Sequence, residues 1–98
     1  MVGVFVKFEY GANFDEGALR KIAETARARF VGMPGLRSKA FTVNSQRREA
    51  TNFYVWESED AAKTFFSEEL LSRVGKLYGV QPTVEFVQIA TLVENAGA

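Results

Sequence analysis

Two apolar periodicities alternate along this chain, and their order limits the folds available to it. Apolar residues recur at every second position over residues 2–10, 36–44, 50–57 and 83–93, as in half-buried strands. They recur every three or four positions over 16–31 and again over 59–78, as in amphipathic helices, with a bend expected near Ser67. The predicted order is strand, helix, strand, strand, helix, strand.

This order predicts an α+β protein with a ferredoxin-like βαββαβ sandwich, in which a four-stranded antiparallel sheet carries both helices on one face. The 98 residues fit one domain, with a core over about residues 2–93 and a flexible tail over 94–98. The first and third strands are expected in the middle of the sheet. Side chains on those two strands are therefore the best placed to line a site.

The chain has more apolar residues than a small domain can easily hide. Hydrophobic residues make up 47% of it, and nine residues are Phe. A domain of this size buries only about 60–65% of its unfolded surface. We therefore expect a homodimer in which the helix-free faces of two sheets pack together, forming a dimeric α+β barrel with a cavity.

The composition excludes several kinds of chemistry. Without Cys there is no disulfide, thiolate nucleophile or iron–sulfur cluster, and without His the usual haem ligand and the commonest zinc ligand are missing. The formal net charge is zero, so no nucleic-acid partner is expected. The sequence shows no signal peptide and no apolar run long enough for a membrane span, so a cytoplasmic protein without membrane contact is expected.

The third strand carries the most distinctive side chains. Alternation places Asn52, Tyr54 and Trp56 on one face of it, and Phe53 and Val55 on the other. Phe53 and Val55 resemble ordinary core residues, so we expect them to meet the helices. The other face, with an amide, a phenol and the only indole, suits a pocket for a flat, partly polar molecule. The sequence therefore predicts a cavity on the helix-free face of the sheet.

Three local runs, together with the order of the elements, point to a family. The runs are Lys7-Phe8-Glu9-Tyr10, then Met33-Pro34-Gly35-Leu36 leading into Ser38-Lys39-Ala40-Phe41, and Tyr54-Val55-Trp56-Glu57 leading into Ser58, Ala61-Ala62 and Phe65. In order and spacing, they resemble the dimeric α+β barrel proteins of the antibiotic-biosynthesis-monooxygenase superfamily, most closely the YdhR-type branch. The likeness spans about residues 2–93.

The resemblance implies a monooxygenase that needs no protein cofactor and acts on a small aromatic molecule such as a phenol, quinol or anthrone. Characterised members of the superfamily carry an Asn and a Trp four residues apart on the third strand, a spacing that Asn52 and Trp56 match. The resemblance implies that Asn52 and Trp56 are the catalytic pair. Asn52 would donate a hydrogen bond to an oxyanion, and Trp56 would stack on the substrate ring. The predicted substrate contacts are Tyr54, Phe5, Lys7, Glu9 and Lys39. The sequence does not choose a general base among the last three.

Other interpretations remain open from the residues themselves. Trp56 and Tyr54 also fit core or interface packing, and Asn52 also fits a partner for backbone groups. A dimeric ligand-binding or structural protein of the same fold is an alternative, as is an isomerase or decarboxylase on the same barrel. An RNA-recognition module shares the element order, but the basic and glycine residues of its third strand are absent here. Haem degradation is disfavoured because it uses a His ligand.

Overall fold

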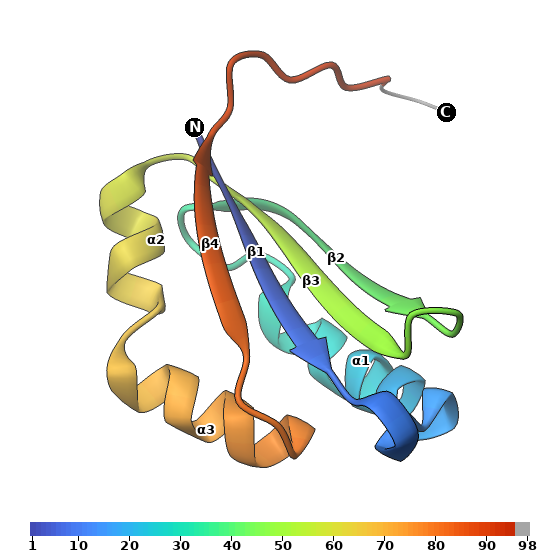
Figure 1. Cartoon of the computed structure of the whole chain (residues 1–98). Helices are drawn as coiled ribbons and strands as arrows, with labels where there is room; N and C mark the ends of the chain where they lie inside the picture. The colour runs from blue at the N-terminus through green and yellow to red at the C-terminus, as the bar shows by residue number, and fades with distance from the viewer. Residues whose placement is uncertain (96–98) are drawn as a thin grey trace.

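The sheet and its helices follow the order expected from the sequence (Figure 1). The computed structural model describes residues 1–95, and its four antiparallel strands lie in the order β2-β3-β1-β4. The strands are β1 (Val2–Glu9), β2 (Leu36–Asn44), β3 (Glu49–Trp56) and β4 (Thr83–Gln88), and the helices are α1 (Glu16–Phe30), α2 (Glu59–Phe65) and α3 (Glu68–Tyr78), with a 3-10 turn at Gly11–Asn13. The predicted ferredoxin-like α+β fold is therefore confirmed, with β1 and β3 in the centre.

Each helix begins at a side chain that satisfies one of the free N–H groups of its first turn. Asp15, Ser58 and Ser67 accept hydrogen bonds of 3.0–3.1 Å from the backbone N–H three residues later. Ser67 thereby starts α3 immediately after α2 has ended, which confirms the expected bend. The last helix ends at Gly79, whose φ of 80° lies in the left-handed region that glycine adopts most easily.

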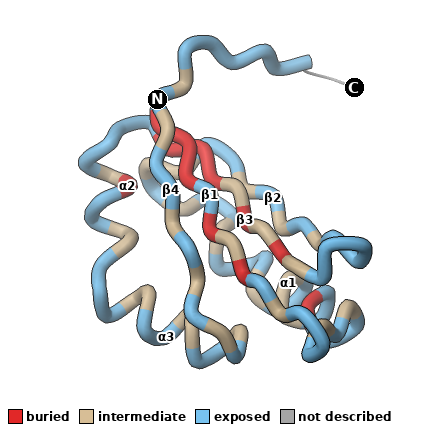
Figure 2. The backbone as a smooth tube through the Cα atoms, in the orientation of Figure 1, coloured by how far each residue is buried: buried red, intermediate tan, exposed pale blue. Residues whose placement is uncertain are grey.

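The core lies between the sheet and the helices, and buried residues alternate along its two central strands (Figure 2). From β1 the buried side chains of this core are Val2, Val4, Val6 and Phe8. Antiparallel pairing sets Val4 opposite Tyr54 and Val6 opposite Asn52. Residues directly opposite each other share a face of the sheet. The face of β3 that meets the helices is therefore the one with Asn52, Tyr54 and Trp56.

This arrangement reverses the face predicted for β3. Asn52, Tyr54 and Trp56 are only 3%, 4% and 1% exposed, and the rings of Phe65 and Phe66 pack against Tyr54 and Trp56. The physical reason is the amount of apolar surface: an indole and a phenol ring bury more of it against helix aromatics than the side chains of the alternate positions do. The prediction that these three residues line a cavity on the helix-free face was wrong.

The helix-free face instead carries Phe5, Phe53 and Val55. The ring centroids of Phe5 and Phe53 lie 4.6 Å apart. Gly3 makes room for Phe53, because a Cβ at Gly3 would lie 3.1 Å from the Phe53 ring and 3.0 Å from Val87. Any site built on Asn52 must therefore lie on the opposite side of the sheet, beneath the helices.

The last strand is shorter than predicted. The sequence predicted a strand over 83–93, but β4 ends at Gln88, which pairs with Val2, the first residue of β1. One further backbone bond, from Ile89 N–H to the Met1 carbonyl at 3.2 Å, ends the pairing, and residues 91–95 run away from the sheet without regular structure (Figure 1). Of the predicted flexible tail, residues 94 and 95 are exposed, and 96–98 lie outside the described residues. No helix within residues 1–95 is long and apolar enough to cross a membrane.

Candidate functional site

Asn52 is the one polar side chain in the buried core of residues 1–95. Its Nδ2 donates a hydrogen bond of 3.1 Å to the hydroxyl of Tyr78, the last residue of α3. Tyr78 is itself fixed, because its ring stacks on Phe8 with centroids 3.9 Å apart and its carbonyl accepts a 2.8 Å bond from the Tyr10 hydroxyl. The amide and the phenol therefore form a rigid polar pair between β3 and α3.

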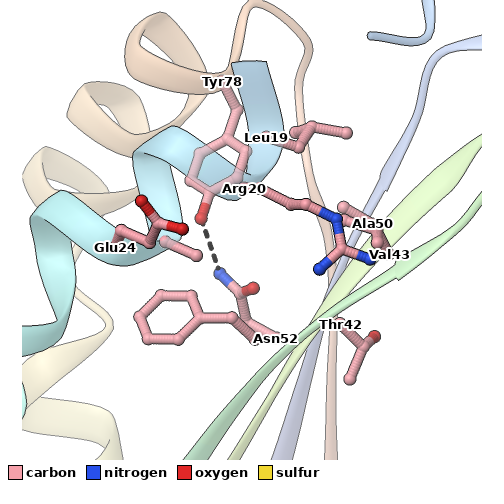
Figure 3. A pocket seen from close by; sticks show the side chains of 10 residues that line it. Leu19, Arg20, Glu24, Thr42, Val43, Ala50, Asn52 and Tyr78 are labelled. Carbon is pink, nitrogen blue, oxygen red and sulfur yellow. Dashed lines mark hydrogen bonds between the residues drawn. The ribbon is translucent and has the colours of Figure 1, made fainter. Parts of the chain in front are cut away.

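A cavity of about 140 Å³ borders this pair (Figure 3). Leu19 and Phe41 give it apolar walls from α1 and β2, and Arg20 and Glu24 lie along the α1 side. The volume is below the roughly 300–1,000 Å³ of most ligand sites. An apolar cavity of about 150 Å³ is known to bind benzene. In this conformation the cavity therefore suits dioxygen or a single small ring.

The polar pair leaves hydrogen-bond donors available to a ligand. Burial raises the pKa of the Tyr78 phenol above its ordinary value, although the hydrogen bond from Asn52 acts in the opposite direction. The phenol is therefore neutral at pH 7 and keeps its proton. The Tyr78 hydroxyl accepts from Asn52 and has no acceptor of its own within residues 1–95, and the Asn52 amide has a second N–H, which also interacts with the Tyr54 phenol. An anionic ligand oxygen in the cavity would have two donors beside it.

Trp56 lies on the same face of β3 but does not border this cavity. Tyr54 stands between it and Asn52, nearly parallel to the indole at a centroid distance of 6.1 Å. Trp56 borders instead an open depression beside the turn at Met33 and Pro34. Its Nε1 is buried and has no hydrogen-bond partner within residues 1–95. Leaving a buried donor unpaired costs about 1–3 kcal/mol, so this N–H is an unsatisfied group of the core.

Lys39 of β2 is held among aromatic rings on the helix-facing side. Its Nζ lies 3.4 Å from the ring centroid of Phe30, 4.1 Å from that of Phe41 and 4.3 Å from that of Tyr54. Burial lowers the pKa of the Lys39 ammonium to about 7, while the ring faces favour its charged form and oppose that shift. Lys39 also borders a second cavity, of about 260 Å³, at the carboxyl end of α1.

The other predicted contacts lie across the sheet from Asn52. Phe5, Lys7 and Glu9 are on the helix-free face, where Lys7 Nζ lies 3.7 Å from carboxylate oxygens of Glu9 and Glu49. Ion pairs that remain in contact with solvent contribute about 0–1 kcal/mol. Of the predicted contacts, Tyr54 and Lys39 therefore lie on the helix-facing side of the sheet, with Asn52 and Trp56. The helix-free face carries the other three, Phe5, Lys7 and Glu9.

Tyr78 is the site residue that the sequence did not single out. In the sequence, Tyr78 is only the last apolar position of the second helical pattern. Its relation to Asn52 depends on 26 residues of intervening chain. The one local signal is a polar amide at an inward position, which requires a buried partner once the face of β3 is known. Within residues 1–95, no group of three or more acidic side chains is arranged to hold a metal ion.

Comparisons with known proteins agree with this architecture. A family model described as "Putative mono-oxygenase ydhR" matches residues 4–88. A Streptomyces coelicolor monooxygenase from the gene ActVA-Orf6, solved in complex with nanaomycin D, superposes with a TM-score of 0.67 at 18% identity, covering 97% of this chain and 92% of the other. SnoaB, a cofactor-independent oxygenase from Streptomyces nogalater, gives a TM-score of 0.67 at 14% identity over 96% of this chain and 97% of its own.

A third solved structure extends the likeness. It is described as a "Putative antibiotic biosynthesis monooxygenase" from Bordetella bronchiseptica, and it gives a TM-score of 0.68 at 18% identity over 92% of this chain and 97% of the other. No curated protein matches the chain. At such identities the solved structures support the fold, and the family assignment depends on the match over residues 4–88.

Proposed function

Because the chain belongs to the YdhR mono-oxygenase family, we propose that it is a cofactor-independent oxygenase that acts on a small aromatic substrate beside Asn52. The observation that carries this proposal is the buried amide and phenol pair. Asn52 and Tyr78 present donors to one cavity whose other walls include Leu19 and Phe41. Donors fixed in a mostly apolar site stabilise negative charge on a substrate oxygen more strongly than water does.

The proposed reaction takes its electrons from the substrate. An anthrone or quinol, with only the ring that bears the ionised oxygen in the cavity, gives one electron to dioxygen, and the resulting substrate radical and superoxide combine into a hydroperoxide. For an anthrone, R₂CH₂ and O₂ give R₂C=O and H₂O, so one oxygen atom enters the product and the other leaves as water. In this proposal Asn52 and Tyr78 hold the ionised oxygen, and the apolar walls exclude solvent from the radical pair.

The remaining helix-facing residues have supporting roles in this proposal. Tyr54 and Trp56 form an aromatic wall along β3 that Phe65 and Phe66 cover, so a substrate ring extending beyond Asn52 would stack on it only after those two rings move aside. The unpaired indole N–H borders a different depression, so it becomes a third donor, after those of Asn52 and Tyr78, only for a substrate that reaches past Tyr54. Lys7 and Glu9 are separated from this wall by the sheet, so neither is assigned as the base. A substrate that ionises in solution requires none.

Isotope labelling tests the proposed reaction. Anthrones, quinols and simple phenols are incubated with the protein under ¹⁸O₂, and the products are analysed by mass spectrometry. We expect one labelled oxygen atom per product molecule with at least one of these classes, at a rate proportional to the amount of folded protein. Heat-denatured protein is the control, and equal labelling in that control would assign the reaction to autoxidation.

A ligand-binding protein without turnover is the second candidate. The observation that favours it is the state of the site, in which Asn52 already has a partner in Tyr78 and the cavity is small. Saturable binding of the same compounds without label transfer would support this candidate.

We further propose that the helix-free face is the contact of a homodimer. Phe5 is 37% exposed at the centre of that face and lies against Phe53, so the face has an apolar centre that a second copy would cover. The substitution Phe5→Glu should shift the protein from dimer to monomer in sedimentation velocity, because two carboxylates would face each other across the contact. Leu77→Glu is the matched control, since Leu77 is 56% exposed on α3. Dimerisation that survives Phe5→Glu would place the contact elsewhere.

A further inference from the structure

The second cavity, at the carboxyl end of α1, has an unusual concentration of positive charge. Three of its lining side chains are basic, namely Arg27 of α1 and Arg37 and Lys39 of β2, and none is acidic. Aromatic and aliphatic groups, including Phe30 and Leu36, complete the walls. A partly enclosed cavity with this lining favours an anionic ligand that also has apolar surface.

Phe41 connects this cavity to the one beside Asn52. Among residues 1–95 it is the only one that lines both, so we infer that its side chain lies between them. Neither the cavity of about 140 Å³ nor the one of about 260 Å³ reaches the roughly 300–1,000 Å³ of most ligand sites. With the Phe41 ring turned aside, the joined space would fall within that range. Rotation of one side chain is a small conformational change for a ligand to induce.

Lys39 lacks the ion pair that a cation in this position would ordinarily have. It makes no salt bridge within residues 1–95, and its Nζ contacts the rings of Phe30, Phe41 and Tyr54 instead. Burying a cation without a carboxylate is unfavourable, and a carboxylate brought by a ligand would relieve that cost.

Arg37, one of the basic residues lining this cavity, already pairs with a carboxylate of the chain. Arg37 Nη2 lies 2.8 Å from an Oε1 of Glu94, in the segment that follows β4. Both side chains are largely exposed, at 42% and 62%, and such a pair contributes only about 0–1 kcal/mol. A ligand carboxylate that reached Arg37 would therefore displace Glu94 at little cost, and Lys39 would give that carboxylate a second, more deeply buried cation.

We propose that the cavity beside Lys39 is a subsite for a carboxylate carried by the aromatic substrate, so that the substrate class is an aromatic acid. The ring lies beside Asn52, the carboxylate pairs with Lys39, and Phe41 turns aside to let one molecule occupy both cavities. This inference rests on the proposed function for the placement of the ring, but binding of the acid requires no turnover.

Calorimetric titration without oxygen tests the subsite apart from the reaction. The probes are 4-hydroxybenzoate and its neutral analogue 4-hydroxybenzamide, titrated into the protein at pH 6.5, where Lys39 is largely protonated. We expect the wild type to bind the acid at least about tenfold more tightly than the amide, as a charge-assisted contact of about 1.5–3 kcal/mol would give. Lys39→Met should abolish that preference, whereas Lys63→Met, an exposed lysine paired with Glu59, should keep it.

The outcomes separate the subsite from the oxygenase. Equal binding of the acid and the amide by the wild type, or an unchanged preference in Lys39→Met, would overturn the subsite. If the preference for the acid depends on Lys39 but the protein transfers no ¹⁸O, the subsite is supported. Only the proposed oxygenase activity is then contradicted. Because methionine fills a similar volume in the ring cage, Lys39→Met should fold, and its circular dichroism spectrum checks this.

Discussion

The substitution Asn52→Ala is expected to lower kcat by about 100- to 1,000-fold while changing KM little, which is the usual effect of removing one donor to a developing oxyanion. Asn52 is a buried donor that lines the cavity between the sheet and α1. When the hydrogen bond from Asn52 is lost, the ring of Tyr78 keeps its stacking contact with Phe8. Steady-state oxygen uptake, with a substrate that incorporates ¹⁸O in the labelling experiment, measures the change.

Two further variants show whether the loss is specific to the amide. Tyr78→Phe removes the hydroxyl partner but keeps the ring on Phe8, so we expect a smaller loss than with Asn52→Ala. Asn13→Ala removes an exposed amide in the 3-10 turn and should leave turnover unchanged. Full activity in Asn52→Ala would mean that the buried amide only joins the sheet to α3.

Substitutions of Trp56 should separate its packing from its hydrogen-bonding role. Trp56→Ala is expected to lower the free energy of unfolding by about 3–5 kcal/mol, since the indole is 1% exposed and packs on Tyr54, Phe65 and Phe66. A domain of this size is stable by only about 5–15 kcal/mol, so this variant would be near the limit of folding. Urea unfolding followed by circular dichroism measures the difference.

The substitution Trp56→Phe is more informative than Trp56→Ala. It keeps an aromatic ring and removes an N–H that has no partner within residues 1–95, so the unfolding free energy should fall much less than in Trp56→Ala. If the indole N–H contacts substrate, kcat should fall by up to about tenfold, the value of one hydrogen bond. Unchanged kcat in a stable Trp56→Phe protein would make Trp56 a core residue without a role in turnover.

The element order was predictable because the two periodicities are local properties of the chain. Strand alternation also showed correctly that Asn52, Tyr54 and Trp56 share a face, but alternation alone does not say which face meets the helices. That choice depended on the pairing of β3 with β1, which sets Val4 and Val6 opposite Tyr54 and Asn52. The sequence favoured the wrong face because amphipathic side chains resemble a site and Phe53 resembles core.

Features that depend on contacts distant in sequence were beyond sequence analysis. The end of β4 is fixed by where β1 begins, so the apolar alternation through residue 93 overstated its length. The ring cage of Lys39 combines Phe30 from α1 with Tyr54 from β3, and the partner of Asn52 comes from the end of α3. Lys39 was identified as a candidate contact, but its surroundings required the folded chain.

The most direct test of the account follows substrate binding and oxygen together. Emission from Trp56, the only indole, is recorded during titration with a hydroxylated aromatic acid, while an electrode records dissolved oxygen in the same cell. We expect saturable quenching in both wild type and Asn52→Ala. In the wild type one molecule of oxygen should be consumed per molecule of product, and in the variant oxygen should be consumed far more slowly. Saturable quenching in a wild type that consumes no oxygen would contradict this expectation and identify a binding protein.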